Sequence, residues 1–365
     1  MRLGDICTIK YGKDHKKLND GDIPLYGSGG VMRHVEKALW SKPSVLIPRK
    51  GTLGNLFFVN KPFWTVDTCF WTDIDEEQVL PEYLFYQLKT KDLASLNVGT
   101  AVPSLTTDVL NEVQIDLPSL EKQKQVVEML GSLDSKIEIN TQLNGYLEKL
   151  VSLEFSRRFK ASTPTIELGK VLSISTESIK PQEHAGEIWE HYSIPAYDEN
   201  RQPLFELSDG IKSNKYAIDA NCILISKLNP ATKRIWMPSC TSEHSVCSTE
   251  FIVYKPKNPR YKSFYYAAID SQAFTDFLIA HVTGSTGSRQ RTQPKATLTY
   301  PMPNPGHDAI EGFCAFANPI YKQIQSNKLE SKWLVSLRDA LLPKLMSGEI
   351  DVSKIELTQL NSHLA

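Results

Sequence analysis

The 365-residue sequence has no long hydrophobic run, few cysteines and almost no net charge. No apolar stretch reaches the roughly 18 residues that a membrane span needs, and residues 1–6 lack the apolar core of a secretion signal. We therefore expect a soluble cytoplasmic protein without membrane association. Its 41% hydrophobic and 23% charged residues are typical of globular proteins, and its length predicts two or more domains.

The six cysteines form no Cys-x-x-Cys pair, so the sequence indicates neither a disulfide framework nor a zinc ribbon. Cys240, His244 and Cys247 share one loop-like stretch, but they would need a fourth ligand from elsewhere to hold zinc. We expect reduced thiols and no metal site.

The common motifs of catalysis are missing as well. The sequence contains no GxxxxGK[ST] loop for a nucleoside triphosphate, no HExxH helix and no GxSxG elbow. The glycine-rich residues 27–30 lack the spacing and the following helix of a cofactor loop. We therefore expect no catalytic residues and no cofactor bound by this chain.

The net charge of −1 argues against a protein that coats nucleic acid through phosphate contacts alone. Residues 1–118 contain 13 Lys and Arg against 15 Asp and Glu, and residues 161–305 contain 15 against 14. Since neither part is basic overall, DNA binding would depend on a few placed side chains, with a partner supplying much of the phosphate contact.

What the sequence does contain is an internal repeat. Leu-Val-Ser-Leu occurs at residues 150–153 and again at residues 334–337, an offset of 334 − 150 = 184. Residues 2–6, Arg-Leu-Gly-Asp-Ile, have a counterpart in residues 167–171, Glu-Leu-Gly-Lys-Val. Several matches in the same order indicate a tandem duplication with a repeat unit of about half the chain.

Short strands and helices alternate within each half, a pattern typical of a mixed α/β fold. The β-branched or aromatic runs at 44–48, 55–59 and 222–226 predict strands. Residues 81–88 and 261–277 predict helices, and we expect their aromatic side chains to lie in the core.

Two long helical patterns, at residues 120–159 and 310–345, follow the two globular stretches. Pro319 lies inside the second pattern, so we expect that helix to begin with a short separate helix or a kink. A helix this long needs a partner for its apolar stripe, and its own duplicate predicts an antiparallel pair. The residues expected to make this pairing are Leu130, Leu133, Ile137, Leu147, Val151, Ile320, Ile324, Leu334, Leu341 and Leu345.

Asn140, Asn144 and Asn327 fall on the same stripes. Buried in the seam, they would fix the register and orientation of the helices. Lying at an exposed edge of the stripe is an equal alternative, and the sequence leaves both open.

Candidate DNA-binding side chains gather in loops of both halves. Arg suits contact with guanine, Gln suits adenine, and Lys, Ser and Thr suit phosphates, although a solvated surface loop is an equal alternative for any single cluster. The candidates of the first half are Lys13, Lys16, Lys17, Arg33, Arg49, Lys50, Thr52, Thr100 and Ser104. Those of the second half are Lys227, Lys233, Arg234, Ser285, Arg289, Gln290, Arg291, Gln293 and Lys295.

The end of the second long helix resembles a family signature. Residues 337–352, Leu-Arg-Asp-Ala-Leu-Leu-Pro-Lys-Leu-Met-Ser-Gly-Glu-Ile-Asp-Val, are similar to the segment that closes the second spacer helix in specificity subunits of type I restriction-modification systems. Residues 117–123, 99–105 and 3–6 support the resemblance, which runs along the whole chain. The loop at 284–289 departs from the Gly-Thr-Ala-Val-Pro-Ser-Leu form of its counterpart at 99–105 in the first half.

The resemblance implies a mixed α/β fold with two target-recognition domains separated by a pair of long antiparallel helices, a coiled coil, and related by an internal pseudo-two-fold repeat. The predicted segments are recognition domain 1 at 1–118, spacer helix 1 at 119–160, recognition domain 2 at 161–305, spacer helix 2 at 306–350 and a tail at 351–365.

For function, the resemblance implies a non-catalytic subunit that recognises an asymmetric, bipartite site in double-stranded DNA. Two methyltransferase subunits would methylate adenine N6, and restriction and translocase subunits would cleave the DNA. S-adenosylmethionine, ATP and Mg²⁺ are expected only on those partners. The alternative is an autonomous coiled-coil scaffold that binds nucleic acid or protein without such partners and shows no bipartite DNA preference.

Overall fold

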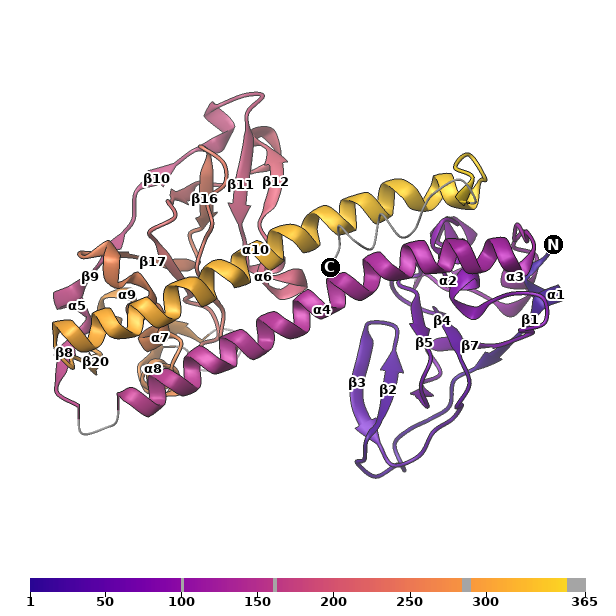
Figure 1. Cartoon of the computed structure of the whole chain (residues 1–365), viewed down its shortest axis with the longest axis horizontal. Helices are drawn as coiled ribbons and strands as arrows, with labels where there is room; N and C mark the ends of the chain where they lie inside the picture. Colours follow the sequence, from indigo (N-terminus) through magenta and orange to yellow (C-terminus); the bar gives the residue numbers. More distant parts are fainter. Residues whose placement is uncertain (100–101, 160–162, 284–289, 353–365) are drawn as a thin grey trace. The chain divides into compact units, whose positions relative to one another are not determined.

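The computed structural model describes residues 1–99, 102–159, 163–283 and 290–352 (Figure 1). Contacts between backbone positions divide the chain into two compact units. Unit 1 comprises Met1–Glu138 and Ser331–Ala365, and unit 2 comprises Ile139–Glu330. Two long helices, α4 (Leu120–Arg158) and α10 (His307–Met346), each contribute to both units.

The elements of unit 1 outside the long helices lie between residues 3 and 111. In chain order they are α1 (Leu3–Ile6), β1 (Cys7–Tyr11), β2 (Ile23–Gly27), β3 (Gly30–Val35), β4 (Ser44–Pro48), β5 (Phe57–Val59), β6 (Trp64–Thr65), β7 (Cys69–Ile74), α2 (Pro81–Lys89), the 3-10 helix η1 (Leu93–Leu96) and α3 (Thr107–Asn111).

Four antiparallel strands form the main sheet of unit 1 in the order β1, β7, β4, β5. All five residues of β4 are buried, and their side chains alternate between two faces of the sheet. Val45 and Ile47 belong to the large core cluster of the unit, whereas Leu46 belongs to a second cluster on the other face. The strand predicted at 44–48 is confirmed. The one predicted at 55–59 begins only at Phe57.

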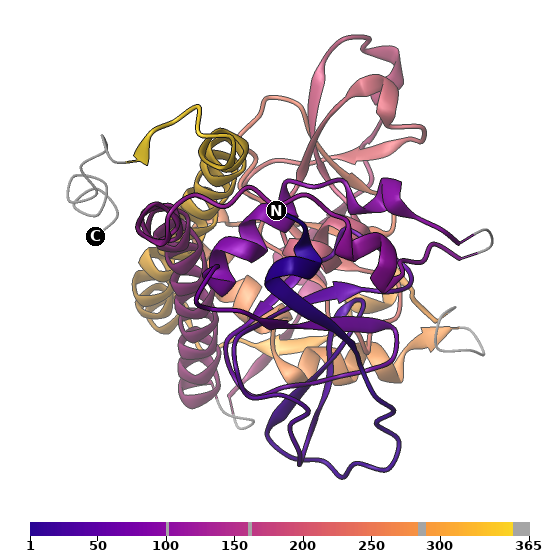
Figure 2. The same ribbon diagram turned by 90° about the vertical axis from the view of Figure 1, so that its right-hand side faces the viewer.

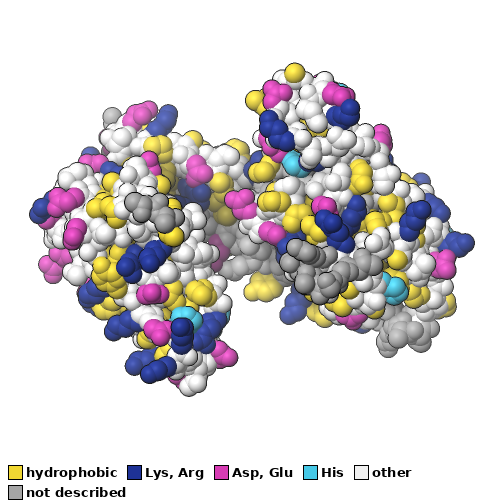
Figure 3. Space-filling view, turned by 180° about the vertical axis from the view of Figure 1, so that it is seen from behind, with side chains coloured by type: hydrophobic (Ala, Val, Ile, Leu, Met, Phe, Trp, Pro, Cys, Tyr) yellow, Lys and Arg dark blue, Asp and Glu magenta, His cyan; other side chains and the backbone are white. Residues whose placement is uncertain are grey.

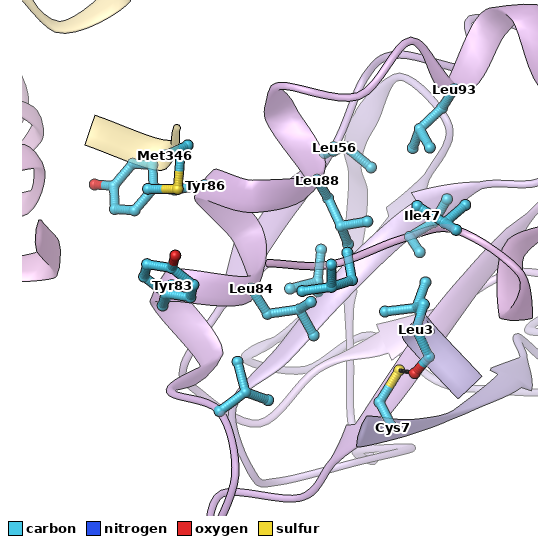
Figure 4. Packing of buried hydrophobic residues seen from close by; sticks show 14 of the residues in the cluster. Leu3, Cys7, Ile47, Leu56, Tyr83, Leu84, Tyr86, Leu88, Leu93 and Met346 are labelled. Carbon is cyan, nitrogen blue, oxygen red and sulfur yellow. Dashed lines mark hydrogen bonds between the residues drawn. The ribbon is translucent and has the colours of Figure 1, made fainter. Parts of the chain in front are cut away.

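The large core of unit 1 joins this sheet to α2 and to one end of each long helix. Figure 4 shows Leu84 and Leu88 of α2 directed toward the strand that carries Ile47, and Met346 of α10 beside Tyr86. Because burying a large aliphatic or aromatic side chain stabilises the folded chain by about 1.5–3 kcal/mol, this cluster fixes α2 and the helix ends to the sheet.

The elements of unit 2 outside the long helices lie between residues 165 and 303. They begin with β8 (Thr165–Glu167), α5 (Leu168–Val171), β9 (Leu172–Ser175), β10 (Ser178–Ile179), η2 (Pro181–Glu183), β11 (Ile188–Tyr192), α6 (Ile194–Asn200), β12 (Leu204–Leu207), η3 (Ser208–Gly210) and β13 (Lys215–Ala217). They continue with β14 (Ile223–Ser226), β15 (Ile235–Trp236), β16 (Ser245–Ser248), β17 (Phe251–Pro256), η4 (Pro259–Tyr261), α7 (Lys262–Ile269), α8 (Gln272–Ala280), β18 (Val282–Thr283), β19 (Arg291–Thr292), α9 (Pro294–Thr297) and β20 (Pro301–Pro303).

The main sheet of unit 2 repeats that of unit 1. Its antiparallel strands lie in the order β9, β17, β14, β15, which corresponds position by position to β1, β7, β4, β5. In β14, as in β4, side chains alternate: Ile223 and Ile225 face the large core, and Leu224 faces a second cluster. The duplication inferred from sequence is therefore a duplication of fold.

The second sheets share a motif but differ in size. Unit 1 has three strands in the order β3, β2, β6, and unit 2 has the equivalent β12, β11, β16 extended by β13 and β10. In both units the middle strand pairs antiparallel with one neighbour and parallel with the other. Figures 1 and 2 show β2 and β3 on the side of unit 1 away from α4, and β11 and β12 on the side of unit 2 away from α7 and α8.

Two sequence predictions about helices are wrong. The helix predicted at 261–277 is divided into η4, α7 and α8, because the Ser271 hydroxyl accepts a hydrogen bond from the Phe274 amide at 3.2 Å and caps a new helix. A separate helix before Pro319 is also wrong, since α10 continues through this residue. Proline removes only the hydrogen bond to the Ala315 carbonyl, and the buried Phe313, Ala317 and Tyr321 hold the helix on both sides.

The two long helices run antiparallel, as predicted. In unit 1, residues early in α4, such as Leu130, share a core with late α10 residues such as Leu345. In unit 2, Val151 late in α4 shares a core with Ile324 nearer the start of α10. Of the ten predicted pairing residues, six are buried: Leu130, Leu133, Val151, Ile324, Leu334 and Leu345. The other four are partly buried: Ile137, Leu147, Ile320 and Leu341.

The asparagines of the helix stripes lie inside the seam, not at its exposed edge. Asn140, Asn144 and Asn327 are 3%, 8% and 4% exposed. The Asn327 side-chain amide donates to Asn144 Oδ1 at 2.8 Å, and the Asn140 amide donates to Glu330 Oε2 at 2.7 Å. These bonds occur at one register only, so they favour that alignment of the two helices within unit 2.

Within the described ranges, no helix has an apolar stretch long enough to cross a membrane.

Candidate nucleic-acid interface

In unit 1 the loop that follows β4 meets the loop that precedes α3. Both carry predicted DNA-binding residues. Two backbone hydrogen bonds and one antiparallel bridge join them: the Gly51 amide to the Pro103 carbonyl at 3.2 Å, the Leu105 amide to the Arg49 carbonyl at 2.9 Å, and Lys50 opposite Ser104. The structure therefore brings Arg49, Lys50 and Ser104 together.

Unit 2 joins its two corresponding loops by the same pattern. The bonds and the bridge are the Asn229 amide to the Gln290 carbonyl at 3.0 Å, the Thr292 amide to the Lys227 carbonyl at 2.9 Å, and Leu228 opposite Arg291. This pairing makes Lys227 the equivalent of Arg49, and Arg291 the equivalent of Ser104. We call this two-loop arrangement, at residues 49–51 with 103–105 and at residues 227–229 with 290–292, the paired-loop frame.

The turn in each frame requires an unusual backbone conformation. Gly51 has a φ of 92° and its equivalent Asn229 a φ of 44°. Glycine adopts this left-handed region without a Cβ clash, and asparagine is among the side chains that tolerate it. The two halves thus reach the same turn with different residues.

The cation at the start of each frame is held in an equivalent way. Arg49 Nη1 donates to the Asp67 carbonyl at 3.3 Å, and Lys227 Nζ donates to the Thr249 carbonyl at 2.5 Å. Each cation also lies over a tyrosine ring, Tyr11 for Arg49 at 5.2 Å and Tyr216 for Lys227 at 5.3 Å. Burial lowers the pKa of the Lys227 ammonium. These contacts fix the orientation of both cations within their frames.

The lysine-rich loop of unit 1 follows β1 and is not part of the paired-loop frame. Lys13, Lys16 and Lys17 are exposed. Arg33 of β3 holds this loop: its Nη2 donates to the carbonyls of His15 and Leu18 at 2.9 and 3.0 Å, and its Nη1 pairs with Asp20 at 2.9 Å. Arg33 therefore positions the lysines, which leaves the lysines themselves as candidates for phosphate contact.

Lys233 and Arg234 are occupied by carboxylates. Arg234 makes two bonds to Asp198, with Nε and Nη2 at 2.6 and 2.9 Å from its oxygens. Lys233 Nζ lies 2.5 Å from Asp270 Oδ1. Both pairs tie the loop after β14 to neighbouring helices, so these cations have structural roles that their sequence position did not reveal.

The second loop of unit 2 presents the remaining described candidates. Arg291 Nη2 lies 3.1 Å from Glu250 Oε1, and its side chain is 58% exposed. Gln293 precedes α9 and Lys295 lies within it, both exposed, while Gln290 is partly buried. Thr52 of unit 1 is exposed beside its frame. Thr100, Ser285 and Arg289 lie outside the described residues.

Sequence reasoning missed Glu250 and the two tyrosines that lie under the frame cations. Glu250 directly precedes β17, and the Lys227 amide donates to its carbonyl at 2.8 Å. In unit 1 the Arg49 amide donates to the Thr68 carbonyl, also at 2.8 Å, so Thr68 is the equivalent residue. An alignment of the two halves could have pointed to Glu250, because Thr68 and Glu250 directly precede equivalent strands, β7 and β17.

Acidic and basic side chains are mixed on the face of the molecule seen in Figure 3, where Lys and Arg are interspersed with Asp and Glu.

Among the described residues, no group of three or more His, Cys, Asp and Glu could hold a metal ion. Burial raises the pKa of the Cys240 thiol to about 12, which disfavours the thiolate that zinc requires.

Comparisons with known proteins agree with one another. A family model described as "Type I restriction modification DNA specificity domain" matches residues 1–149. The type I restriction enzyme MjaIX specificity subunit of Methanocaldococcus jannaschii is 22% identical over 93% of this chain and 89% of its own length. The HindI specificity subunit of Haemophilus influenzae is 22% identical over 74% of this chain and 78% of its own length.

The fold is also found in a solved structure. The type I restriction-modification S subunit from M. genitalium matches with a TM-score of 0.61 at 15% identity, over 94% of this chain and 95% of that one. Residues 1–149 thus match the type I specificity domain, and most of the chain is similar in sequence to type I restriction enzyme specificity subunits and shares the fold of one such subunit.

Proposed function

We propose that this chain is the DNA-reading subunit of a type I restriction-modification complex and that each unit recognises one half of an asymmetric, interrupted site. The observation that carries the proposal is the paired-loop frame. The same backbone arrangement occurs once in each unit, yet it presents Lys50 and Ser104 in one and Leu228 and Arg291 in the other. An identical support with different side chains is what two different half-sites require.

The long helices would set the distance between the half-sites. They contain 39 and 40 residues, which corresponds to about 60 Å of helix at the usual rise. The Asn144 to Asn327 bond favours one register of the pair. In this proposal helix length, and not any contact with the intervening base pairs, determines the length of the unread spacer.

We further infer that partner subunits carry the chemistry. The sequence contains no nucleotide-binding or hydrolase motif, so S-adenosylmethionine, ATP and Mg²⁺ would bind to two methyltransferase subunits and to restriction and translocase subunits. The chain would act in the cytoplasm, where it meets chromosomal DNA, and would direct methylation to adenine N6.

The part of α4 in unit 2 offers a surface for such a partner. Five large apolar residues are exposed in a four-three spacing along one stripe: Ile139, Leu143, Tyr146, Leu150 and Leu153. We call these residues the α4 stripe. The spacing fits an apolar helix packed alongside, and exposed apolar rows of this kind mark interaction sites. We assign the stripe to a helix of the methyltransferase subunit.

The proposal is tested by mapping N6-methyladenine across the genome of the host with and without this gene. Loss of a single interrupted motif is the expected result. Unchanged methylation together with tight binding of DNA or protein by the isolated chain would instead support the scaffold alternative. The inference that helix length sets the spacer is tested by adding or removing seven residues in both helices, which should change the spacer and leave both half-sites intact.

A further inference from the structure

One cation in each paired-loop frame is held in the same place by equivalent backbone groups. Arg49 and Lys227 occupy equivalent positions at the start of their frames. Their charged groups donate to the carbonyls of Asp67 and Thr249. Each of these carbonyls lies two residues before an equivalent strand, β7 in unit 1 and β17 in unit 2. The position of the cation is therefore common to both halves of the chain.

The aromatic ring beside each cation comes from a different part of the fold. Arg49 lies over Tyr11, at the end of β1 in the main sheet, and Lys227 lies over Tyr216 of β13 in the second sheet. Among the described strands, unit 1 has no counterpart of β13. The two units thus hold an equivalent cation with tyrosines that are not equivalent. Such a ring attracts a cation without removing its charge.

Neither cation forms an ion pair with a carboxylate within the described ranges, unlike Arg234. Arg49 and Lys227 each donate to one backbone carbonyl, out of the five N–H donors of a guanidinium and the three of an ammonium. Glu250 lies near Lys227 but forms its ion pair with Arg291, so this group of two cations and one carboxylate remains positive. Both cations are partly exposed, and an anion that approaches the frame meets a positive charge.

The frame positions next to the cations do not keep their character. Lys50 corresponds to Leu228, and Ser104 corresponds to Arg291. Positions that differ between the units suit the bases, in which two half-sites differ. A position that keeps its charge suits what every half-site shares, which is the phosphate backbone.

The exchange of arginine for lysine between the two units fits the same role. Reading guanine through O6 and N7 requires two donors in a fixed geometry, and a planar guanidinium and a flexible ammonium do not provide it in the same way. A phosphate binds either cation. We propose that Arg49 and Lys227 are equivalent phosphate contacts, one in each unit, which place the DNA backbone on the frame without reading sequence.

This inference rests on the proposed function, and its test separates the two. Binding by the complex of the full chain with its methyltransferase subunits is measured on duplexes that carry the mapped site, with each base pair of both half-sites replaced in turn, over a series of salt concentrations. If the wild-type complex does not distinguish an interrupted motif, the proposed function fails. The salt dependence of the variants on a single duplex still tests the phosphate contacts.

Arg49→Gln and Lys227→Gln should each lower the affinity for every duplex about tenfold, because each removes a charged hydrogen bond. The slope of log affinity against log salt should become less steep by about 0.9 in each variant. The base preference at every position should stay unchanged. Lys42→Gln is the matched control, since it removes an exposed cation that precedes β4, at the end of the strand opposite the frame, and it should change neither affinity nor slope.

The variants Arg49→Lys and Lys227→Arg keep the charge and should retain both the affinity and the salt slope. They also decide the question if a glutamine variant fails to fold, since exchanging the donor geometry would alter a base contact. Two results would overturn the proposal. One is a preference lost at a single base pair in any of these variants, which identifies a base contact. The other is wild-type affinity and salt slope in both glutamine variants.

Discussion

The two units have the same main sheet and the same paired-loop frame, but they differ in the side chains on the frame and in the size of the second sheet. The strand order β1, β7, β4, β5 of unit 1 is matched by β9, β17, β14, β15 of unit 2. The second sheet has three strands in one and five in the other. After the duplication, the two halves have therefore kept the main sheet and the backbone of the frame. They differ in the frame side chains and in the second sheet.

The cores of the units also differ in character. The core of unit 2 contains a group of aromatic rings, with Phe313 5.5 Å from Phe155 and 5.6 Å from Phe159 between ring centroids. The corresponding region of unit 1 is built largely from aliphatic residues such as Leu130 and Leu345. The same helix pair is thus anchored by different chemistry at its two ends.

The largest effect is expected from removing a core side chain in one unit. Phe313→Ala should lower the free energy of unfolding by about 3–5 kcal/mol, since Phe313 is fully buried, and Leu130→Ala in unit 1 by about 2–5 kcal/mol. Hydrogen exchange read by mass spectrometry should show faster exchange mainly in the mutated unit. Tyr146→Ala is the control, because that side chain is 70% exposed. Equal acceleration in both units would show that the two cores unfold together.

The next effect concerns the α4 stripe, which lies in the unit 2 part of the helix. Leu143→Glu with Leu150→Glu should weaken assembly with the methyltransferase subunit about a hundredfold or more, because two charges would be buried against an apolar helix. Co-purification and sedimentation measure it. Ser135→Glu, at an exposed position in the unit 1 part of α4, should have no such effect. Undiminished assembly of the double variant would place the partner elsewhere.

A smaller effect is expected in the polar seam. Asn327→Leu should cost about 1–3 kcal/mol, because it leaves the buried Asn144 side chain without its donor, and adding Asn144→Leu should recover much of that loss. Urea denaturation of the two single variants and the double variant gives the coupling. If the stability losses of the two single variants simply add in the double variant, Asn144 and Asn327 are not energetically coupled. In unit 1, Asp134 of α4 accepts hydrogen bonds from the Tyr86 hydroxyl of α2 at 2.6 Å and from Arg338 Nη1 of α10 at 2.7 Å.

The smallest effect concerns Asp198 and Arg234. Arg234 holds the pKa of the Asp198 carboxyl below its ordinary value, so the unfolded chain binds the proton more readily. The contribution of the pair is present above about pH 4 and is lost as the pH falls through the lowered pKa. Asp198→Asn should cost less than about 1 kcal/mol at pH 7, because Asp198 is 47% exposed. A pH series of denaturation curves should show the wild type and the variant converging in acid.

In the same comparison, Arg234→Gln should leave the DNA preference of unit 2 unchanged, because its guanidinium is occupied by Asp198. A change of base preference in Arg234→Gln would show that the ion pair opens on DNA.

Much of the fold could be predicted from the sequence because periodicity and turn residues are local signals. The repeat offset, the strand at 44–48 and the two long helices all follow from such signals. The sequence predicted one continuous helix where the chain breaks at Ser271, and it predicted a separate first helix or a kink at Pro319, where α10 continues. In the first case a side-chain cap outweighed an apolar pattern, and in the second packing on both sides outweighed one lost hydrogen bond.

The candidate site was less predictable. Loop composition indicated Arg33, Arg49, Arg234 and Arg291 alike as candidates, but it could not show what each guanidinium contacts within the fold. Arg33 donates to two backbone carbonyls, and Arg234 makes two bonds to Asp198. Ion pairs between residues 36 positions apart, such as Asp198 and Arg234, depend on which strands and helices become neighbours.

The sequence by itself determined the duplication, the mixed α/β class, the antiparallel helices and the loops that carry the candidate DNA-binding side chains, since these depend on patterns of neighbouring residues. Only the tertiary structure decided that residues 49–51 pair with 103–105 as residues 227–229 pair with 290–292, and that Glu250 lies beside Arg291. Spacing along the chain does not fix such contacts. They form because sheet pairing and core packing bring distant backbone segments within hydrogen-bonding distance.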